Sequence, residues 1–352
     1  MINQTKIGEF EKGMDMVDKT ELEESEKKKR PTYPQDWPCY NNAQTKEKQM
    51  FYSIINEIVD YIPLKERMKG RGRPALNERD MLFCSIIKIY SMFSSRRIIS
   101  DLNFAKKMGY IQSVPHFNSV CNYINSTDFE YYLKYLIQLS SLPLRQIEDK
   151  FAVDASGFGI AKYEKWVKAR LNNGIHKVYK KLHVSCGVYT NIITDAEVTD
   201  GTKNDSPFFQ PLVNSTAKRF NIKEVSADKG YLSRDNLQVV SSVGGIAFIP
   251  FKKNVTGKAR GSMLWSRMFE HFSKHKEDFM KHYHLRSNVE TVFSMIKMKF
   301  GGNLKTKKDQ SQKNEVLLKC LCHNICVLIS ETFTLGIDLD FNKCAEIMSA
   351  QK

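Results

Sequence analysis

Residues 283–300 read YHLRSNVETVFSMIKMKF, and the order of polar and apolar residues predicts a helix with two different sides. Successive residues of a helix are turned by about 100°, so residues three or four apart share a side. One stripe is apolar and consists of Val289, Val292, Phe293, Ile296 and Phe300. The adjacent arc, about 60° wide, holds Tyr283, Arg286, Glu290 and Lys297. We therefore expect one continuous helix that buries its apolar stripe against a sheet and presents the polar arc beside it.

Two aspartates follow short apolar runs earlier in the chain. Asp154 ends the run FAVD and is followed by Ala-Ser-Gly, and Asp228 ends the run VSAD and is followed by Lys-Gly-Tyr. A carboxylate after an apolar strand projects from the sheet edge, where sites are commonly built. A single aspartate in this position is more often a turn cap, and Arg286 and Glu290 could be an exposed i,i+4 ion pair. Those readings leave Tyr283 and the close alignment unexplained, so the two aspartates and Glu290 are the candidate site.

This set of carboxylates suits a particular chemistry. Two aspartates and a glutamate offer hard oxygen ligands, which fit Mg²⁺ or Mn²⁺. Two such ions, about 4 Å apart, can hold the attacking and leaving oxygens of a phosphoryl transfer. The neighbouring Arg286 and Lys297 would hold phosphates as fixed cations.

The remaining periodicity predicts a mixed α/β domain with one sheet, preceded by helices. Residues 48–145 have helical spacing throughout, whereas the segment from 146 to 335 mixes strands and helices. A hairpin is predicted from two β-like runs joined at Thr190-Asn191. We expect four parts: a disordered tail and leader over 1–47, a helical region over 48–145, the α/β domain over 146–335 and a C-terminal tail over 336–352.

The charge of the chain indicates a polyanionic partner. Lys and Arg number 54 against 39 Asp and Glu, which gives a net charge of +15. The excess is concentrated in residues 61–110, 161–181 and 251–320, and the last of these blocks surrounds Glu290. Nucleic acid is the first candidate for such a partner. We expect no membrane binding, because the most apolar stretch, residues 316–337, contains charged and polar residues and is interpreted as a buried helix.

The helical region contains two candidate DNA-binding features. A basic strip, Gly70-Arg-Gly-Arg-Pro74, could lie along phosphates through Arg71 and Arg73, although a solvated loop has the same composition. Residues 94–125 predict short helices with a glycine-containing turn and begin near Arg96 and Arg97. That pattern suits a helix-turn-helix, and an ordinary helical bundle is the alternative.

Two further features favour structural roles. Cys320, Cys322, His323 and Cys326 lie on an apolar helical pattern and lack the paired spacing of a zinc knuckle, so we interpret them as core residues. Trp265 could stack on a DNA base, but a core position is the favoured interpretation. The stretch before Tyr283 that contains it is predicted to be helical and basic, without a β-rich insertion.

Taken together in order, the motifs resemble those of the DDE transposases of bacterial insertion sequences that carry a Y-R-E-K signature. The resemblance rests on VDASGF at Asp154, ADKGY at Asp228 and the spacing Y-x2-R-x3-E-x6-K from Tyr283 to Lys297. Lys181-Leu-His183, Gly201-x3-Asp205 and the basic strip at 70–74 support it. It covers roughly residues 70–330.

The resemblance implies an RNase H-like mixed sheet flanked by helices, after an all-helical N-terminal DNA-binding region. Asp154, Asp228 and Glu290 would bind two Mg²⁺ or Mn²⁺ ions, and water and then a DNA 3′-hydroxyl would attack phosphodiesters. The implied DNA contacts are Tyr283, Arg286, Lys297, Arg71, Arg73 and Lys181. The implied partners are transposon-end and target DNA, bound by a homodimer in the nucleoid-containing cytoplasm of a prokaryotic host. The alternatives are an RNase H-like metal-dependent nuclease without strand transfer and a catalytically silent DNA-binding derivative.

Overall fold

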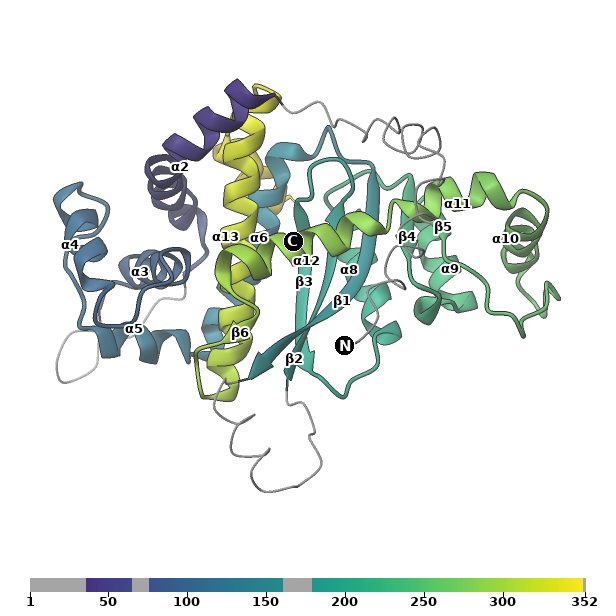
Figure 1. The fold of residues 1–352 in the computed structure, drawn as a ribbon, viewed down its shortest axis with the longest axis horizontal. Coiled ribbons are helices and arrows are strands. Elements are labelled where there is room, and N and C mark those ends of the chain that lie inside the picture. Colours follow the sequence, from purple (N-terminus) through teal and green to yellow (C-terminus); the bar gives the residue numbers. More distant parts are fainter. Residues whose placement is uncertain (1–35, 65–75, 161–178, 351–352) are drawn as a thin grey trace, which may run out of the picture.

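The computed structural model describes residues 36–64, 76–160 and 179–350. Arg71 and Arg73 of the basic strip lie outside these ranges, as does most of the basic block over 161–181. Helices gather at both ends of a central sheet: α2 to α5 lie on one side of it and α10 and α11 on the other (Figure 1).

A six-stranded mixed sheet organises the fold, which confirms the prediction of an α/β domain with one sheet. Its main path runs in the order β3-β2-β1-β4-β5. β1 pairs antiparallel with β2 and parallel with β4, and β2 and β3 form the predicted hairpin. The short β6 pairs parallel with the far end of β1. The strands are β1 (Lys150–Ile160), β2 (Tyr179–Gly187), β3 (Ile193–Asp200), β4 (Glu224–Ala227), β5 (Ile246–Phe248) and β6 (Asn303–Leu304).

The two faces of the sheet pack against two different hydrophobic cores. Successive side chains of a strand point to opposite faces, so β1 sends Phe151 and Val153 to one core and Ala152 and Phe158 to the other. The first core includes α8 (Phe209–Ala217), α9 (Arg234–Ser242), α10 (Met263–Lys274) and α11 (Lys276–His284). The second includes α12 (Ser287–Phe300), α13 (Asp309–Thr334) and the N-terminal helices. α12 crosses in front of the sheet in Figure 1.

The N-terminal helices begin earlier than the sequence analysis expected. They are α2 (Trp37–Ile58), α3 (Glu78–Tyr90), α4 (Ile99–Lys107), α5 (Phe117–Ile124) and α6 (Thr127–Ser141). The expected start near Lys48 is wrong, because the Asp36 carboxylate accepts the backbone N–H of Cys39 and caps the helix at Trp37. Pro38 lies in the first turn, where proline removes no helical hydrogen bond.

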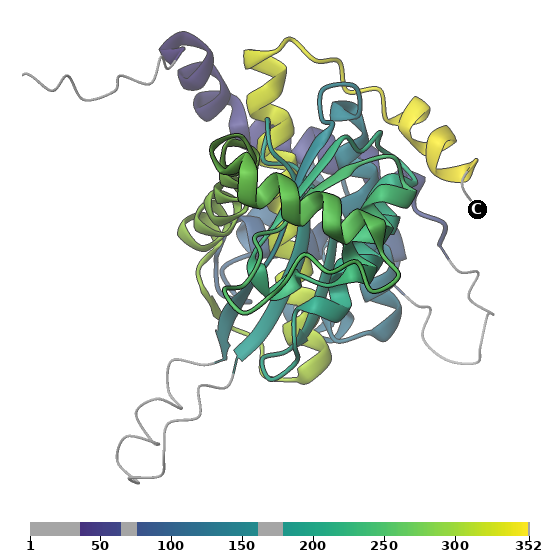
Figure 2. The same ribbon diagram turned by 90° about the vertical axis from the view of Figure 1, so that its right-hand side faces the viewer.

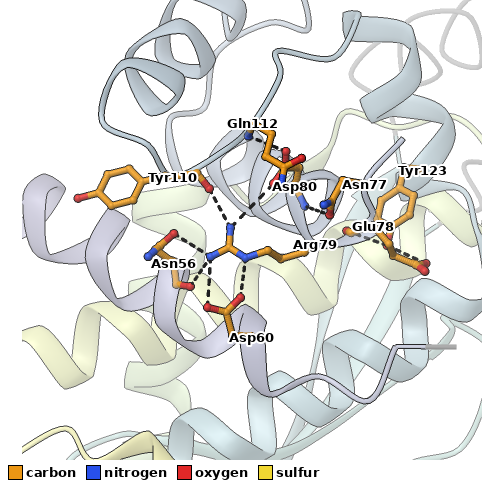
Figure 3. A network of polar contacts seen from close by, with 9 residues as sticks. All are labelled: Asn56, Asp60, Asn77, Glu78, Arg79, Asp80, Tyr110, Gln112 and Tyr123. Carbon is orange, nitrogen blue, oxygen red and sulfur yellow. Dashed lines mark hydrogen bonds and ion pairs between the residues drawn. The ribbon is translucent and has the colours of Figure 1, made fainter. Parts of the chain in front are cut away.

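A partly buried arginine fixes these helices to one another (Figure 3). Arg79 of α3 donates to the Asp60 carboxylate, to Asn56 of α2 and to the carbonyl of Tyr110. Its neighbour Asp80 accepts the backbone N–H of Gln112 at 2.8 Å. Charge-assisted hydrogen bonds are stronger than neutral ones, so this network holds α2, α3 and the loop before α5 as one unit.

The long helix α13 forms the centre of the second core. By length and composition it could cross a membrane, but 72% of its apolar window is buried inside the protein, as expected for a core helix. Asn324 bonds β3 through both the N–H and the carbonyl of Ile193, which satisfies its buried amide. Cys320 and Cys322 are fully buried, which confirms the interpretation of this cluster as core.

The C-terminal residues are not simply a tail. α14 (Phe341–Ser349) follows α13 after a loop and lies apart from it in Figure 2. Its apolar side, with Phe341, Cys344 and Met348, is buried. Asp340 caps it by accepting the N–H of Lys343. The short amphipathic pattern was too close to the chain end to stand out in the sequence.

His323 of α13 gives the fold a defined pH dependence. Its ring is buried and its Nε2 lies 2.9 Å from the carbonyl oxygen of Asn191. Burial lowers the pKa of His323 to about 4, below its ordinary value of 6.5. Between pH 4 and pH 6.5 the His323 ring binds a proton in the unfolded chain but not in the folded protein. Stability must therefore fall as the pH drops from 6.5 to 4, by up to about 1.4 kcal/mol per pH unit for this group.

We predict that His323→Gln flattens this pH dependence, because the titrating group is removed. Urea unfolding at several pH values between 4 and 7 measures the slope, and the exposed His284→Gln is the matched control. The two variants should differ in slope, and an unchanged slope in His323→Gln would contradict the assignment.

Candidate active site

The sheet brings Asp154 and Asp228 side by side. In the parallel pair of β1 and β4, Val153 is the register partner of Ala227, so the next residue on each strand is an aspartate. Adjacent strands are about 4.8 Å apart, which places both carboxylates over one point of the sheet. Each also follows a residue that faces the first core, so by alternation both point toward the side of α12.

Only one of the two aspartates lies at a strand end. Asp228 follows β4 directly and caps a single turn, Lys229–Tyr231, as expected. Asp154 lies inside β1, so its predicted position at a strand end is wrong. β1 continues because β2 pairs with it as far as Gly159, whereas β4 stops at Ala227. The site therefore lies at the end of β4 and above the middle of β1.

The helix expected over residues 283–300 is in fact two helices. Tyr283 belongs to the last turn of α11, and α12 begins at Ser287. At the junction, the Ser287 hydroxyl donates to the carbonyl of His284 and the Asn288 amide donates to that of Leu285. Serine and asparagine bond nearby backbone groups in this way and so compete with regular helix. The single-helix expectation is wrong, although Glu290 and Lys297 share α12.

Arg286 stands at this junction and joins two of the three carboxylates. Its Nη1 lies 2.5 Å from Oδ2 of Asp154, and its Nη2 lies 2.5 Å from Oε1 of Glu290. The Arg286 and Asp154 side chains are 20% and 19% exposed, whereas Glu290 is 59% exposed. The Arg286–Asp154 contact is thus shielded from solvent, while Glu290 lies at the rim of the site.

Asp154 interacts electrostatically with both Asp228 and Glu290. Burial raises the pKa of Asp154, and the charges of Asp228 and Glu290 raise it further, while Arg286 opposes the change. Like charges this close disfavour one another's ionisation unless a cation lies between them. In this structure the guanidinium of Arg286 is that cation.

Lys297 contacts the same strand farther along. Its Nζ donates to the Ser156 hydroxyl at 2.6 Å and lies 5.3 Å from the centre of the Phe158 ring. Burial lowers the pKa of Lys297. Ser156 belongs to the motif around Asp154, but nothing in the sequence indicated that it pairs with Lys297.

Lys181 has a partner within the protein. Its Nζ lies 2.8 Å from Oδ1 of Asp205, and Nδ1 of His183 lies 3.6 Å from the same oxygen. His183 is fully buried and stacks on Phe208, and burial lowers its pKa to about 4. The structure thus joins the two supporting motifs, and it ties the Lys181 ammonium to a carboxylate.

Tyr231 is a site residue that the sequence analysis did not single out. It ends the turn capped by Asp228, and its hydroxyl is buried without a hydrogen-bond partner among the described residues. Burial raises the pKa of Tyr231, and Asp154, Asp205 and Asp228 raise it further. The Tyr231 hydroxyl is therefore close enough to Asp154, Asp205 and Asp228 to interact electrostatically with each of them.

The two aromatic candidates for DNA contact, Tyr283 and Trp265, have different surroundings. Tyr283 has its ring centre 6.0 Å from the guanidinium carbon of Arg286. Trp265 is 5% exposed and packs between Phe251 and the guanidinium of Arg234, so it is a core residue. The helices α10 and α11 occupy residues 263–284, which confirms the prediction that this stretch is helical.

The donor set fits a divalent cation once Arg286 has moved. Within the three described ranges, no group of three or more His, Cys, Asp or Glu is already placed around a common point. The two oxygens that Arg286 bridges are nonetheless hard ligands from two different elements, and a guanidinium stands in for a cation there.

Comparisons with known proteins place the chain in a family. The model of the transposase DDE domain matches residues 145–325. A probable transposase for the insertion sequence element ISA1214 of Archaeoglobus fulgidus is 23% identical over 324 residues, which are 89% of this chain and 93% of that protein. The piggyBac transposase, solved in a synaptic complex with hairpin DNA, matches with a TM-score of 0.40 and 12% identity over 86% of this chain and 78% of that one. Since the family match spans just over half of the sequence, the chain belongs to the transposase DDE domain family and is a transposase.

Proposed function

We propose that this transposase binds the ends of its DNA element, hydrolyses phosphodiester bonds there and joins the 3′-hydroxyl ends to target DNA. The observation that carries the proposal is the convergence of Asp154 and Glu290 on one guanidinium beside Asp228. Two carboxylates, from a strand and a helix, that share one cation beside a third carboxylate have the composition of a site for divalent metal ions.

We further propose that Asp154, Asp228 and Glu290 hold two Mg²⁺ or Mn²⁺ ions. The ions would lower the pKa of the attacking hydroxyl and stabilise the leaving oxygen. Asp154 and Asp228 are fixed by the sheet register, so their separation is set before any ion binds. Glu290 is the exposed member and can adjust, because it lies on the first turn of α12.

The cations beside the carboxylates would position the DNA. Arg286, once released from Asp154 and Glu290, can donate two parallel hydrogen bonds to a phosphate. Lys297 reaches the strand beside Asp154 and is held there by Ser156, so it is placed for a neighbouring phosphate. Lys181 shares its charge with Asp205, so its proposed DNA contact is the weakest of the three.

The rest of the architecture supports the same proposal. Three antiparallel strands followed by two parallel ones, with Asp154 on the central strand β1 and Asp228 just after its neighbour β4, fit an RNase H-like fold. We propose that residues 146–335 form this catalytic domain and that residues 48–145 bind DNA. A homodimer on DNA, in the cytoplasm of a prokaryotic host, stays a prediction.

We predict that Asp154→Asn and Glu290→Gln each lower metal-dependent cleavage of end DNA by at least about a hundredfold, since each removes a charged ligand. DNA binding should persist, because neither residue is a cation. Gel analysis of labelled element-end duplexes in Mg²⁺ measures both effects. Glu277→Gln, an exposed carboxylate of α11, is the matched control and should cut at the wild-type rate. Retained cleavage in either site variant would refute the assignment.

A second prediction concerns Arg286 without DNA. An ion between Asp154 and Glu290 must replace the guanidinium, so Arg286→Gln should bind Mn²⁺ roughly tenfold more tightly than the wild type. Isothermal titration calorimetry on the DNA-free protein measures this affinity. Arg267→Gln, an exposed arginine of α10, is the control and should leave it unchanged. Equal or weaker Mn²⁺ binding in Arg286→Gln would contradict the exchange.

A further inference from the structure

We propose that a hollow beside α4 binds the phosphate backbone of duplex DNA. The duplex runs from the carboxylate site along α12. This arginine hollow is lined by Phe93, Arg96, Arg97, Ile99, Ser100 and Asn103. The inference rests on the proposed function in one respect, namely that the transposase acts on duplex DNA. It adds a second DNA contact, made by residues outside the catalytic signature.

The two arginines of the hollow are oriented by aromatic rings. The guanidinium of Arg96 lies 5.2 Å from the centre of the Phe117 ring, and that of Arg97 lies 5.1 Å from the Phe93 ring. Both arginines are exposed, and the ion pairs of the described residues do not include them. A guanidinium stacked on a ring keeps its hydrogen-bonding edge available, which suits bidentate recognition of phosphate.

The other lining groups favour a phosphate backbone over bases or an apolar partner. Ser100 and Asn103 add neutral hydrogen-bond donors of the kind that contact DNA phosphates. The rings of Phe93 and Phe117 already carry the arginines, so they do not form a bare platform for unstacked bases. Duplex DNA is therefore the occupant that this chemistry fits.

The hollow adjoins the C-terminal end of the helix that carries Glu290. The ammonium of Lys305, the residue after β6, donates to the carbonyl of Met92 at 2.8 Å. Phe93 lines a second, smaller hollow together with Phe300, the last residue of α12. From Glu290 to Phe300 the helix rises about 15 Å, which corresponds to about four base pairs of duplex.

Two acids beside the surface between the two sites, Glu47 and Glu315, are paired with other described residues and so repel DNA less. From Thr291 to Phe300 the sequence has two lysines and no acidic residue. Glu47, which lies near this helix, is bonded to Lys299 and to the hydroxyl of Tyr90. Glu315 accepts the backbone N–H groups of Lys305 and Thr306. Phosphates that leave the carboxylate site would thus meet Lys297, then Lys305 and then the arginine hollow.

The hollow is built on a rigid base. The Arg79 network of Figure 3 ties α3 to the loop at Tyr110 and Gln112, which leads into α5. Phe117, the ring beneath Arg96, is the first residue of α5. A site supported in this way loses little freedom on binding, so its arginines are prepared for a ligand.

The test is the salt dependence of binding to a 24-base-pair duplex in EDTA, measured by fluorescence anisotropy. Each phosphate contact contributes about 0.9 to the slope of log affinity against log salt. The double variant Arg96→Ala/Arg97→Ala should therefore have a slope shallower than the wild type by about two. Lys218→Ala/Lys343→Ala removes the same charge from exposed lysines at α8 and α14 and should keep the wild-type slope.

The outcomes separate this inference from the proposed function. If the wild type binds and cuts duplex DNA but the arginine variant keeps the wild-type slope, the inference is overturned and the proposed function stands. The inference is also overturned if the salt-dependence slopes of both double variants become shallower by the same amount, because the change in net charge alone would then explain the effect. If the wild type does not bind duplex DNA, both are overturned. Thermal melting of each variant checks that the fold is intact.

Discussion

The contact of Arg286 with Asp154 and Glu290 is the constraint on which the site depends. Without a cation, carboxylates from β1, the end of β4 and α12 would repel one another, because they lie close together above one point of the sheet. The guanidinium offsets this repulsion and ties the start of α12 to the sheet. The apolar stripe of the same helix is buried behind it, so packing and charge hold α12 in one place.

The two hydrophobic cores pack on opposite faces of the sheet and connect it to different helices. The core with α8 to α11 supports the far face of the sheet, whereas the core with α12 and α13 links the strands β1 to β3 to the N-terminal helices. Because this second core is continuous, the arginine hollow and the carboxylate site belong to one packed body. On the proposed path along α12, a duplex would therefore meet a surface whose position is fixed relative to the three carboxylates.

Spacing in the sequence predicted a mixed α/β domain with one sheet and three carboxylates that the fold brings near one another. Asp228 lies where its apolar run predicted, and Glu290 and Lys297 share one helix. Regular periodicity could not reveal the break at Leu285–Arg286, because it depends on side chains that bond the local backbone. Nor could it place Asp154 inside β1, since the length of that strand is set by its partner β2. The pairings of Lys181 with Asp205 and of Lys297 with Ser156 join residues far apart in the chain and exist only in the folded protein.

A crystal structure of the DNA-free protein with Mn²⁺ is the most direct test of the central claim. Anomalous scattering locates manganese independently of the protein atoms. We expect manganese within about 2.2 Å of carboxylate oxygens of Asp154, Asp228 and Glu290, with the Arg286 side chain turned away from them. Manganese bound elsewhere, with Arg286 still joining Asp154 to Glu290, would contradict this claim.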